Sequence, residues 1–105
     1  MPGYDLIISP NAEKDLTRAF CWYEAESKGL AVGFMAAYRR QCDRLASAPF
    51  MYAKYRKEIR RCSLTKFPYH LYYLIDEDRA RIDIIAVLHQ SRDPLLMDQR
   101  LGGRE

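Results

Sequence analysis

Residues 60 to 94 read RRCSLTKFPYHLYYLIDEDRARIDIIAVLHQSRDP, and this stretch decides the fold. Aromatic and β-branched residues dominate two apolar runs within it, at 69–75 and 82–88. A proline or an acidic turn bounds each run, which is typical of strands. Together with the run at 60–65, they predict three consecutive antiparallel strands connected as a meander.

The middle of these strands, 69–75, is apolar on both faces. Side chains alternate along a strand, so one face carries Tyr69, Leu71, Tyr73 and Ile75 and the other carries His70, Tyr72 and Leu74. A strand with one wet face would alternate between apolar and polar residues. We therefore expect both faces to be covered, one by helices and the other by loops, by a partner chain or by the molecule on which the protein acts.

The first half of the chain predicts a short strand and then a helix. Residues 4–8 form the strand, and Ser9 and Pro10 supply an N-cap and a proline at the first helical position. Apolar residues then recur at helical spacing until Gly29, which is expected to end the helix. The stripe expected to face the core is Ala12, Leu16, Ala19, Phe20 and Tyr23.

A second helix follows Gly29 almost at once and ends at 47–49. Its expected core face is Leu30, Phe34, Tyr38, Cys42 and Leu45. Because the connection is so short, the two helices form an antiparallel hairpin. Trp22 lies just off the stripe of the first helix, which favours partial burial at the flank of the hairpin over an exposed binding aromatic.

The predicted fold class is α+β. Residues 50–58 form a loop with a short strand near 52–56, so the order is strand, helix, helix and then three or four strands. We expect a two-layer sandwich, in which the N-terminal strand and the helical hairpin pack on one face of a mainly antiparallel sheet of four to five strands. The N-terminal strand must join this sheet beside one of the later strands, and the sequence does not say which. Residues 1–105 make a single domain, with 95–105 as a C-terminal tail or short helix.

The formal net charge is only +3, but the cations are unevenly distributed. Lys54, Arg56, Lys57, Arg60, Arg61 and Lys66 lie in one short stretch that contains a single acidic residue, Glu58. Such a cluster fits phosphate or an acidic protein surface. It also fits a solvated strand edge that charge keeps soluble.

The cysteines and histidines predict neither a disulfide framework nor a metal site. Three cysteines leave one unpaired, and no secretory signal precedes Tyr4, so we expect reduced thiols and a cytoplasmic protein. Ligand spacing for a metal is missing, and Cys42 is interpreted as a small core residue rather than a nucleophile. No apolar run approaches the roughly 20 residues of a membrane helix.

Four short motifs follow one another along the chain. They are Ser9-Pro10-x-Ala12 at a helix start, Arg60-Arg61 entering a strand, Phe67-Pro68-Tyr69-x-x-Tyr72-Tyr73, and the closing His89-Gln90-x-Arg92-Asp93-Pro94. In this order and at these spacings they resemble the RelE/ParE superfamily of bacterial toxins from type II toxin–antitoxin modules, over about residues 4 to 101. The resemblance implies a small basic toxin that a cognate antitoxin, encoded beside it, neutralises by wrapping an extended segment and a helix around it in a hetero-oligomer.

The RelE-like branch consists of endoribonucleases that cut messenger RNA on the ribosome. The resemblance implies an arginine early in the middle strand, an arginine after the last strand and often a tyrosine further on. This chain has Tyr69, Gln90 and Leu96 at or near those positions, although Arg92 is nearby. In this alternative the catalytic residues would be His89, Arg92 and Arg61, with His89 as acid or base. We favour a local hydrogen bond for His89, one that orients the C-terminal segment.

Loss of the ribonuclease pattern favours the ParE-like branch, whose members bind and poison DNA gyrase and are not hydrolases. The resemblance then implies no cofactor, no metal and no membrane partner, and it assigns binding of the target or the antitoxin to Lys54, Arg56, Lys57, Arg60, Arg61 and Arg92. In the structural alternative, Arg60 and Arg61 form salt bridges to neighbours such as Asp83, and His70 is a core histidine. A third possibility is a member without toxic activity that binds only a partner.

Overall fold

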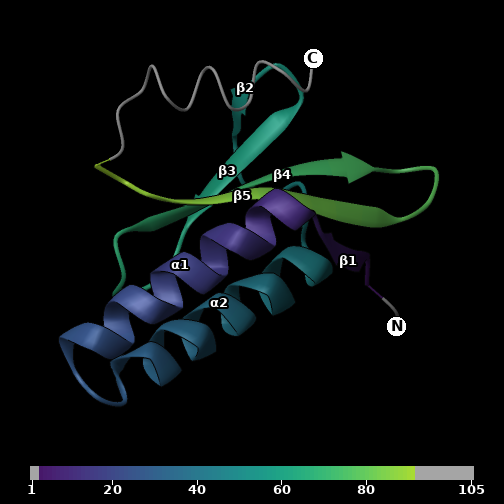
Figure 1. Cartoon of the computed structure of the whole chain (residues 1–105). Coiled ribbons are helices and arrows are strands. Elements are labelled where there is room, and N and C mark those ends of the chain that lie inside the picture. The colour runs from purple at the N-terminus through teal and green to yellow at the C-terminus, as the bar shows by residue number, and fades with distance from the viewer. Residues whose placement is uncertain (1–2, 92–105) are drawn as a thin grey trace.

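The computed structural model describes residues 3–91 of the 105-residue chain. Its elements are β1 (Asp5–Ile8), α1 (Pro10–Glu26), α2 (Leu30–Ser47), β2 (Lys54–Arg56), β3 (Ile59–Ser63), β4 (Tyr69–Asp76) and β5 (Arg81–His89). The strands form one sheet in the order β1-β5-β4-β3-β2 (Figure 1). The predicted α+β class, the meander and the two layers are confirmed, whereas the tail at 95–105 and Arg92 lie outside the described residues.

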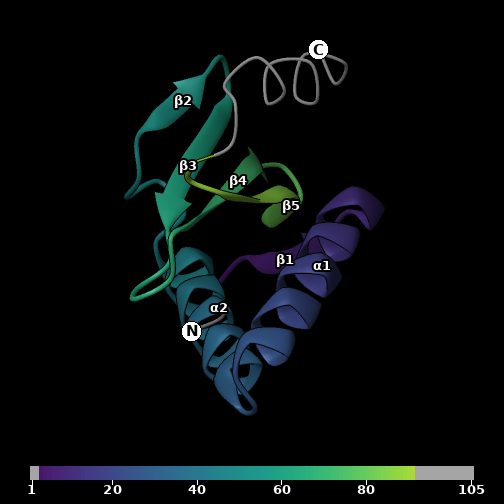
Figure 2. The same ribbon diagram turned by 60° about the vertical axis from the view of Figure 1, so that its left-hand side comes forward.

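Both helices pack on the same side of the sheet (Figures 1 and 2). The Ser9 side chain accepts the Ala12 N–H at 3.1 Å, as predicted for an N-cap. Gly29, however, does not end α1, which stops at Glu26 with Ser27 as its C-cap. Gly29 instead precedes α2 with a φ of 89°, because the tight turn between the helices needs a residue that tolerates the left-handed region. Within residues 3–91, neither helix is long and apolar enough to cross a membrane.

Strand β1 occupies the edge of the sheet beside β5, a position that the sequence left open. It runs parallel to β5, with Leu6 opposite Ile82 and Ile8 opposite Ile84. All other strand pairs are antiparallel. The sheet is therefore mixed, and the N-terminal strand is joined to the last described strand of the chain.

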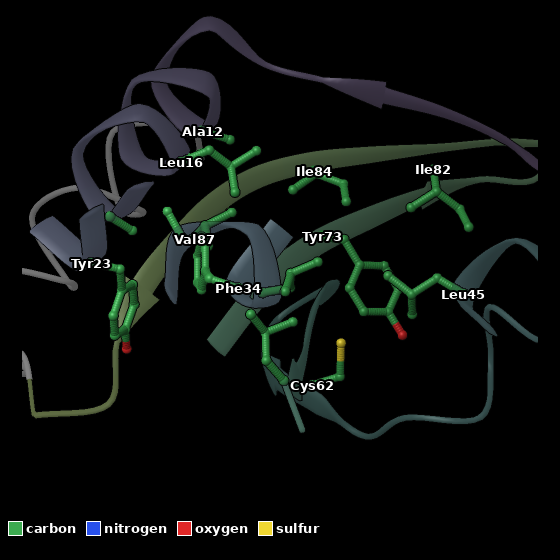
Figure 3. Close-up of a cluster of buried hydrophobic side chains, with 14 residues drawn as sticks. Ala12, Leu16, Tyr23, Phe34, Leu45, Cys62, Tyr73, Ile82, Ile84 and Val87 are labelled. Atoms are coloured by element: carbon green, nitrogen blue, oxygen red, sulfur yellow. The ribbon is translucent and has the colours of Figure 1, made fainter. Parts of the chain in front are cut away.

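Buried apolar clusters lie on both faces of the sheet, as the pattern of the middle strand predicted. The helix-facing cluster joins the helices to Leu71, Tyr73 and Val87, and Figure 3 shows its centre. The far-face cluster consists of Ile59, Tyr72, Ile85, Ala86 and Leu88. Two predictions for the helix stripes were wrong, because Phe20 and Leu30 lie at the border of the packed face and are exposed.

A β-bulge in β5 decides which of its residues face the helices. Tyr72 lies opposite Ala86 and Tyr73 opposite Ile84, so Ile85 has no partner of its own on β4. The extra residue shifts the alternation by one position. As a result Ile84 and Val87 lie in the helix-facing cluster, while Ile85 and Ala86 both lie in the far-face cluster.

The carboxylate of Asp15 connects α1 to β5 just after this bulge. Asp15 is only 5% exposed, and its Oδ2 accepts the Val87 N–H at 3.0 Å. Backbone N–H groups point to alternate sides along a strand. The Gln90 N–H donates to the Pro68 carbonyl oxygen on the β4 side, so the Val87 N–H, three residues earlier, points away from β4. In the described part of the chain β1 pairs with β5 only as far as Ile84, so Asp15 supplies the acceptor that a neighbouring strand would have provided.

We expect Asp15→Ala to lower the free energy of unfolding by about 1–3 kcal/mol, because it leaves the buried Val87 N–H without its acceptor. At this chain length the melting temperature should fall by roughly 4–8 °C per kcal/mol. Thermal and urea unfolding followed by circular dichroism measure the loss. Lys14→Ala, on the exposed side of the same helix, is the matched control, and equal stability of the two variants would contradict the role of Asp15.

Candidate functional site

The basic stretch is divided by the sheet and does not form one patch. Lys54 on β2 lies 3.2 Å from Glu58 Oε1 in an exposed ion pair. Lys57 occupies the turn between β2 and β3 with a φ of 50°. On β3, Ile59 belongs to the far-face cluster and Cys62 to the helix-facing cluster. Alternation therefore puts Arg60 on the helix-facing side and Arg61 on the far side.

Arg60 has a structural role. Its Nη1 donates to the Tyr52 carbonyl oxygen at 2.6 Å, and its guanidinium lies 5.2 Å from the centre of the Phe50 ring. These contacts tie the loop after α2 to β3. The suggested salt bridge to Asp83 is wrong for both arginines of the pair, because Asp83 pairs with Arg81 instead.

Arg61 is exposed on the far face among aromatic rings. Its guanidinium lies 4.8 Å from the centre of the Tyr55 ring, and it sits opposite Tyr72 in the strand register. A cation over an aromatic face is held electrostatically. His70 lies on the same face, half-buried, and its pKa is lowered by burial and by the charge of Arg61. We call Tyr55, Arg61 and His70, which lie over the buried Tyr72, the Arg61 face. His70 is at its margin rather than in the core.

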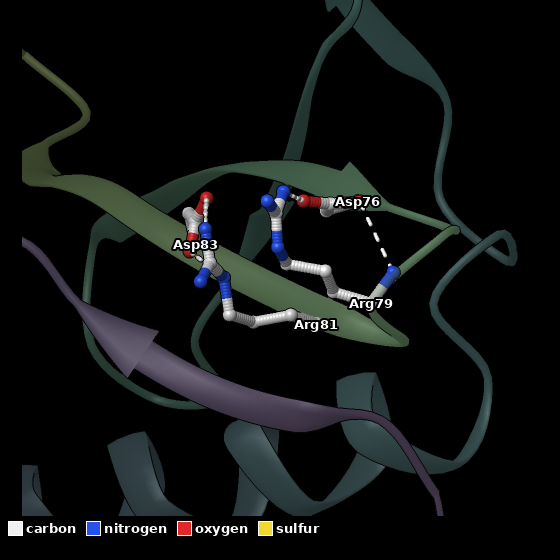
Figure 4. A network of polar contacts seen from close by, with 4 residues as sticks. All are labelled: Asp76, Arg79, Arg81 and Asp83. Atoms are coloured by element: carbon white, nitrogen blue, oxygen red, sulfur yellow. Dashed lines mark hydrogen bonds and ion pairs between the residues drawn. The ribbon is translucent and has the colours of Figure 1, made fainter.

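The arginines at the β4–β5 turn are paired with neighbouring carboxylates (Figure 4). Arg79 donates from its backbone N–H to Asp76 Oδ1 at 3.2 Å and from Nη1 to Oδ2 at 3.0 Å, and these hydrogen bonds lower the pKa of Asp76. Arg81 Nε lies 3.0 Å from Asp83 Oδ1 as an ion pair, and its Nη2 donates to Oδ2 at 3.4 Å. These pairs brace the turn of the hairpin.

His89 lies at the end of β5 on the helix-facing side. It is paired with Tyr69, and the two ring centres are 5.1 Å apart. Its Nδ1 accepts the Ser91 N–H at 3.1 Å and lies 2.8 Å from Ser91 Oγ. His89 therefore makes the kind of local hydrogen bond that the sequence suggested. Of the alternative catalytic set, His89 and Arg61 lie on opposite faces of the sheet, and Arg92 is outside the described residues.

A hollow of about 330 Å³ opens between α1 and the ends of β4 and β5. Its lining includes Arg18, Ala19, Trp22, Tyr69, His89 and Ser91, and we call it the Trp22 hollow. The expectation of partial burial for Trp22 was wrong, since the residue is 55% exposed, although its ring packs nearly perpendicular to the ring of the buried Tyr23. Sequence reasoning missed this site because its walls come from segments that are far apart in the chain.

Cys42 and Cys62 are not activated thiols. Burial raises the pKa of Cys62 to about 11 and also raises that of Cys42, so both stay protonated at neutral pH. Cys42 packs against the helix-facing cluster, in line with its interpretation as a core residue. Across residues 3–91, no three side chains of the metal-ligating types gather into a site.

Comparison with known proteins matches residues 6–94 to the family described as "ParE toxin of type II toxin-antitoxin system, parDE". No curated protein sequence matches the chain. The solved structures that share the fold include three at 21% sequence identity or less: the chromosomal ParDE TA system from P. aeruginosa, the intact E. coli RelBE toxin–antitoxin complex, and the RelBE2 complex from Mycobacterium tuberculosis.

The P. aeruginosa structure has a TM-score of 0.71 at 16% identity, over 82% of this chain and 95% of that one. For the E. coli complex the TM-score is 0.64 at 14% identity, over 85% and 99% of the two chains. For the M. tuberculosis complex it is 0.63 at 21% identity, over 88% and 97%. ParE-type and RelE-type structures therefore share this architecture, and the fold by itself does not separate them.

The lowered pKa of His70 predicts a pH-dependent stability. In the folded protein the pKa of His70 lies below 6.5. Between that pKa and pH 6.5, His70 is therefore protonated more fully in the unfolded chain than in the folded one. The contribution of the neutral His70 to the free energy of unfolding is complete above pH 6.5 and is lost as the pH falls through the pKa of the folded state. Melting temperatures from pH 8 to pH 5 should show this decline, and His70→Gln should flatten it. If both curves decline equally, the decline belongs to other groups and the assignment to His70 fails.

Proposed function

The chain belongs to the ParE toxin family of type II toxin–antitoxin systems, and on that premise we propose that it stops growth by binding DNA gyrase and holding it on cut DNA. The toxin itself makes and breaks no bond. It acts in the cytoplasm and is neutralised by a cognate antitoxin. The proposal concerns the target and the mode of action, which membership of the family leaves open.

The observation that carries the proposal is the separation of Arg61 from His89. Cleavage of RNA by its 2′-hydroxyl needs a proton-transferring group and cations around one phosphate. In β4, Tyr69 faces the helices beside His89, whereas Tyr72 faces away beside Arg61. The sheet lies between the two functional groups. In the described residues, the only histidine beside Arg61 is His70, and burial and the charge of Arg61 lower its pKa, which makes it a poor proton donor to a leaving group.

The Arg61 face is suited to holding a partner. An exposed guanidinium that is fixed over Tyr55 loses little conformational freedom when it meets a carboxylate. Arginine and tyrosine are also enriched among the residues that dominate binding energy at protein interfaces. We place the first contact with gyrase here, and added salt should weaken that contact.

An antitoxin partner is supported by two findings. The family is defined by a toxin–antitoxin pair, and the E. coli and M. tuberculosis structures of the same fold are toxin–antitoxin complexes. The formal charge of +3 favours an acidic partner. The resting form is then a hetero-oligomer of toxin and antitoxin.

Supercoiling and cleavage assays with purified gyrase test the proposal. We expect the toxin to inhibit supercoiling and to accumulate cleaved DNA. Arg61→Ala should raise the inhibitory concentration by about tenfold or more, in the range of an interface hot spot. Arg79→Ala, which removes an exposed cation from the other end of the sheet, should change it less than about twofold, and His89→Ala should remain inhibitory.

Three results would contradict this assignment. If gyrase is unaffected while translated messages acquire new cuts in primer extension, the protein is the ribosome-dependent nuclease of the alternative. Loss of those cuts in His89→Ala, with an unchanged circular dichroism spectrum, would assign the proton transfer to His89. If the protein binds its antitoxin but affects neither gyrase nor messages, it is a partner-binding member without toxic activity.

A further inference from the structure

The Trp22 hollow plays no part in the proposed contact with gyrase. Its walls are Arg18, Ala19 and Trp22 of α1 on one side and Tyr69 and His89 at the ends of β4 and β5 on the other. It therefore opens on the helix-facing side of the sheet, whereas Arg61 lies on the far side. The Trp22 hollow is therefore a second surface, separate from the one that we assign to gyrase.

We propose that this hollow is the anchor site for the antitoxin, and that it accepts one large apolar side chain from a linear segment with acidic neighbours. The inference rests on the proposed function in one respect only, the existence of an antitoxin partner. It adds the place of the anchor, the chemistry of the anchoring residue and the charge of its surroundings.

The aromatic lining selects an apolar side chain. Trp22 is 55% exposed and packs against Tyr23 in a T-shaped arrangement with ring centres 5.0 Å apart, so its position is fixed by packing while much of its surface stays in water. Opposite it, the rings of Tyr69 and His89 pack edge to face. Filling the space between these walls would remove apolar surface from water on both sides.

The charge at the rim selects acidic neighbours for that side chain. Arg18 is exposed at the mouth of the hollow, whereas Asp15 is buried beneath it and already accepts the Val87 N–H. A carboxylate on the incoming segment can therefore pair with Arg18 at the rim. Tryptophan, tyrosine and arginine together are the residue types of an interface hot spot.

The shape of the hollow favours a linear segment over a folded surface. One wall is a helix and the other is formed by two strand ends, with a volume of about 330 Å³ between them. This space admits a side chain or two from an extended or helical segment. A flat protein surface would contact the rim and leave the hollow empty.

Trp22 is the only tryptophan of the chain, and its fluorescence reports directly on the hollow. The probe is the antitoxin encoded beside this gene, with any tryptophan of its own replaced by phenylalanine. We expect its addition to shift the emission of Trp22 to shorter wavelength and to reduce quenching by acrylamide. In calorimetric titrations Trp22→Ala should weaken antitoxin binding by about tenfold or more.

The matched control is Phe20→Ala. Phe20 is an exposed aromatic on the same helix, two residues before Trp22, and it lines a different groove beside Met35 and Arg39. Its substitution should change antitoxin affinity less than about twofold. Trp22→Ala should also keep the potency of the wild type against gyrase, because the Arg61 face is untouched.

Unchanged Trp22 emission on binding, or equal affinities of Trp22→Ala and the wild type for the antitoxin, would overturn the inference. Loss of gyrase inhibition by Trp22→Ala with intact antitoxin binding would make gyrase the occupant and overturn it too. A Trp22 emission that depends on toxin concentration alone would make a second copy the occupant, with the same consequence. If the toxin does not inhibit gyrase but Trp22 responds to the antitoxin as expected, the proposed target fails and the anchor site stands.

Discussion

The hydrogen bond from the Val87 N–H to the Asp15 carboxylate determines much of the rest of the structure. Strand β5 continues beyond the end of β1, so its outer edge needs an acceptor after Ile84. Asp15 provides it from α1 and so holds the helix against the bulged part of the strand. The bulge in turn sets the phase that brings His89 to the helix-facing side beside Tyr69. The Trp22 hollow exists because this helix and this strand end are fixed to each other.

Much of the fold was accessible from the sequence because its determinants are local. The N-cap of α1, the two-sided apolar pattern of β4 and the turns between strands each need only a few neighbouring residues. The bulge could not be predicted in this way, because residues 84–87 are all apolar and the sequence does not show which of them face the helices and which face away. The position of β1 was also out of reach, since pairing with β5 joins segments more than 70 residues apart.

The candidate site was harder to predict, and the arginine pair shows why. Alternation alone puts Arg60 and Arg61 on opposite faces, yet it does not say which one is used structurally. That depends on Tyr52 and Phe50, which sit in a loop of irregular pattern and meet Arg60 only in the folded chain. Trp22 illustrates the same limit, because a residue beside a helical stripe is buried or exposed according to how far the neighbouring strands extend. Here β4 begins at Tyr69 and β5 ends at His89, and the indole of Trp22 remains exposed.

The proposed assignment of the target to one face of the sheet and the antitoxin to the other constrains how the toxin can be neutralised. An antitoxin anchored at Trp22 does not cover Arg61, because the sheet lies between them. To block the target it must continue around an edge of the sheet, and both edges are short, with four residues in β1 and three in β2. Strand β2 carries Tyr55, which holds Arg61 in place. On the proposed assignment, a segment that reaches this edge neutralises the toxin by displacing the Tyr55 ring from Arg61, and it need not resemble the surface of gyrase.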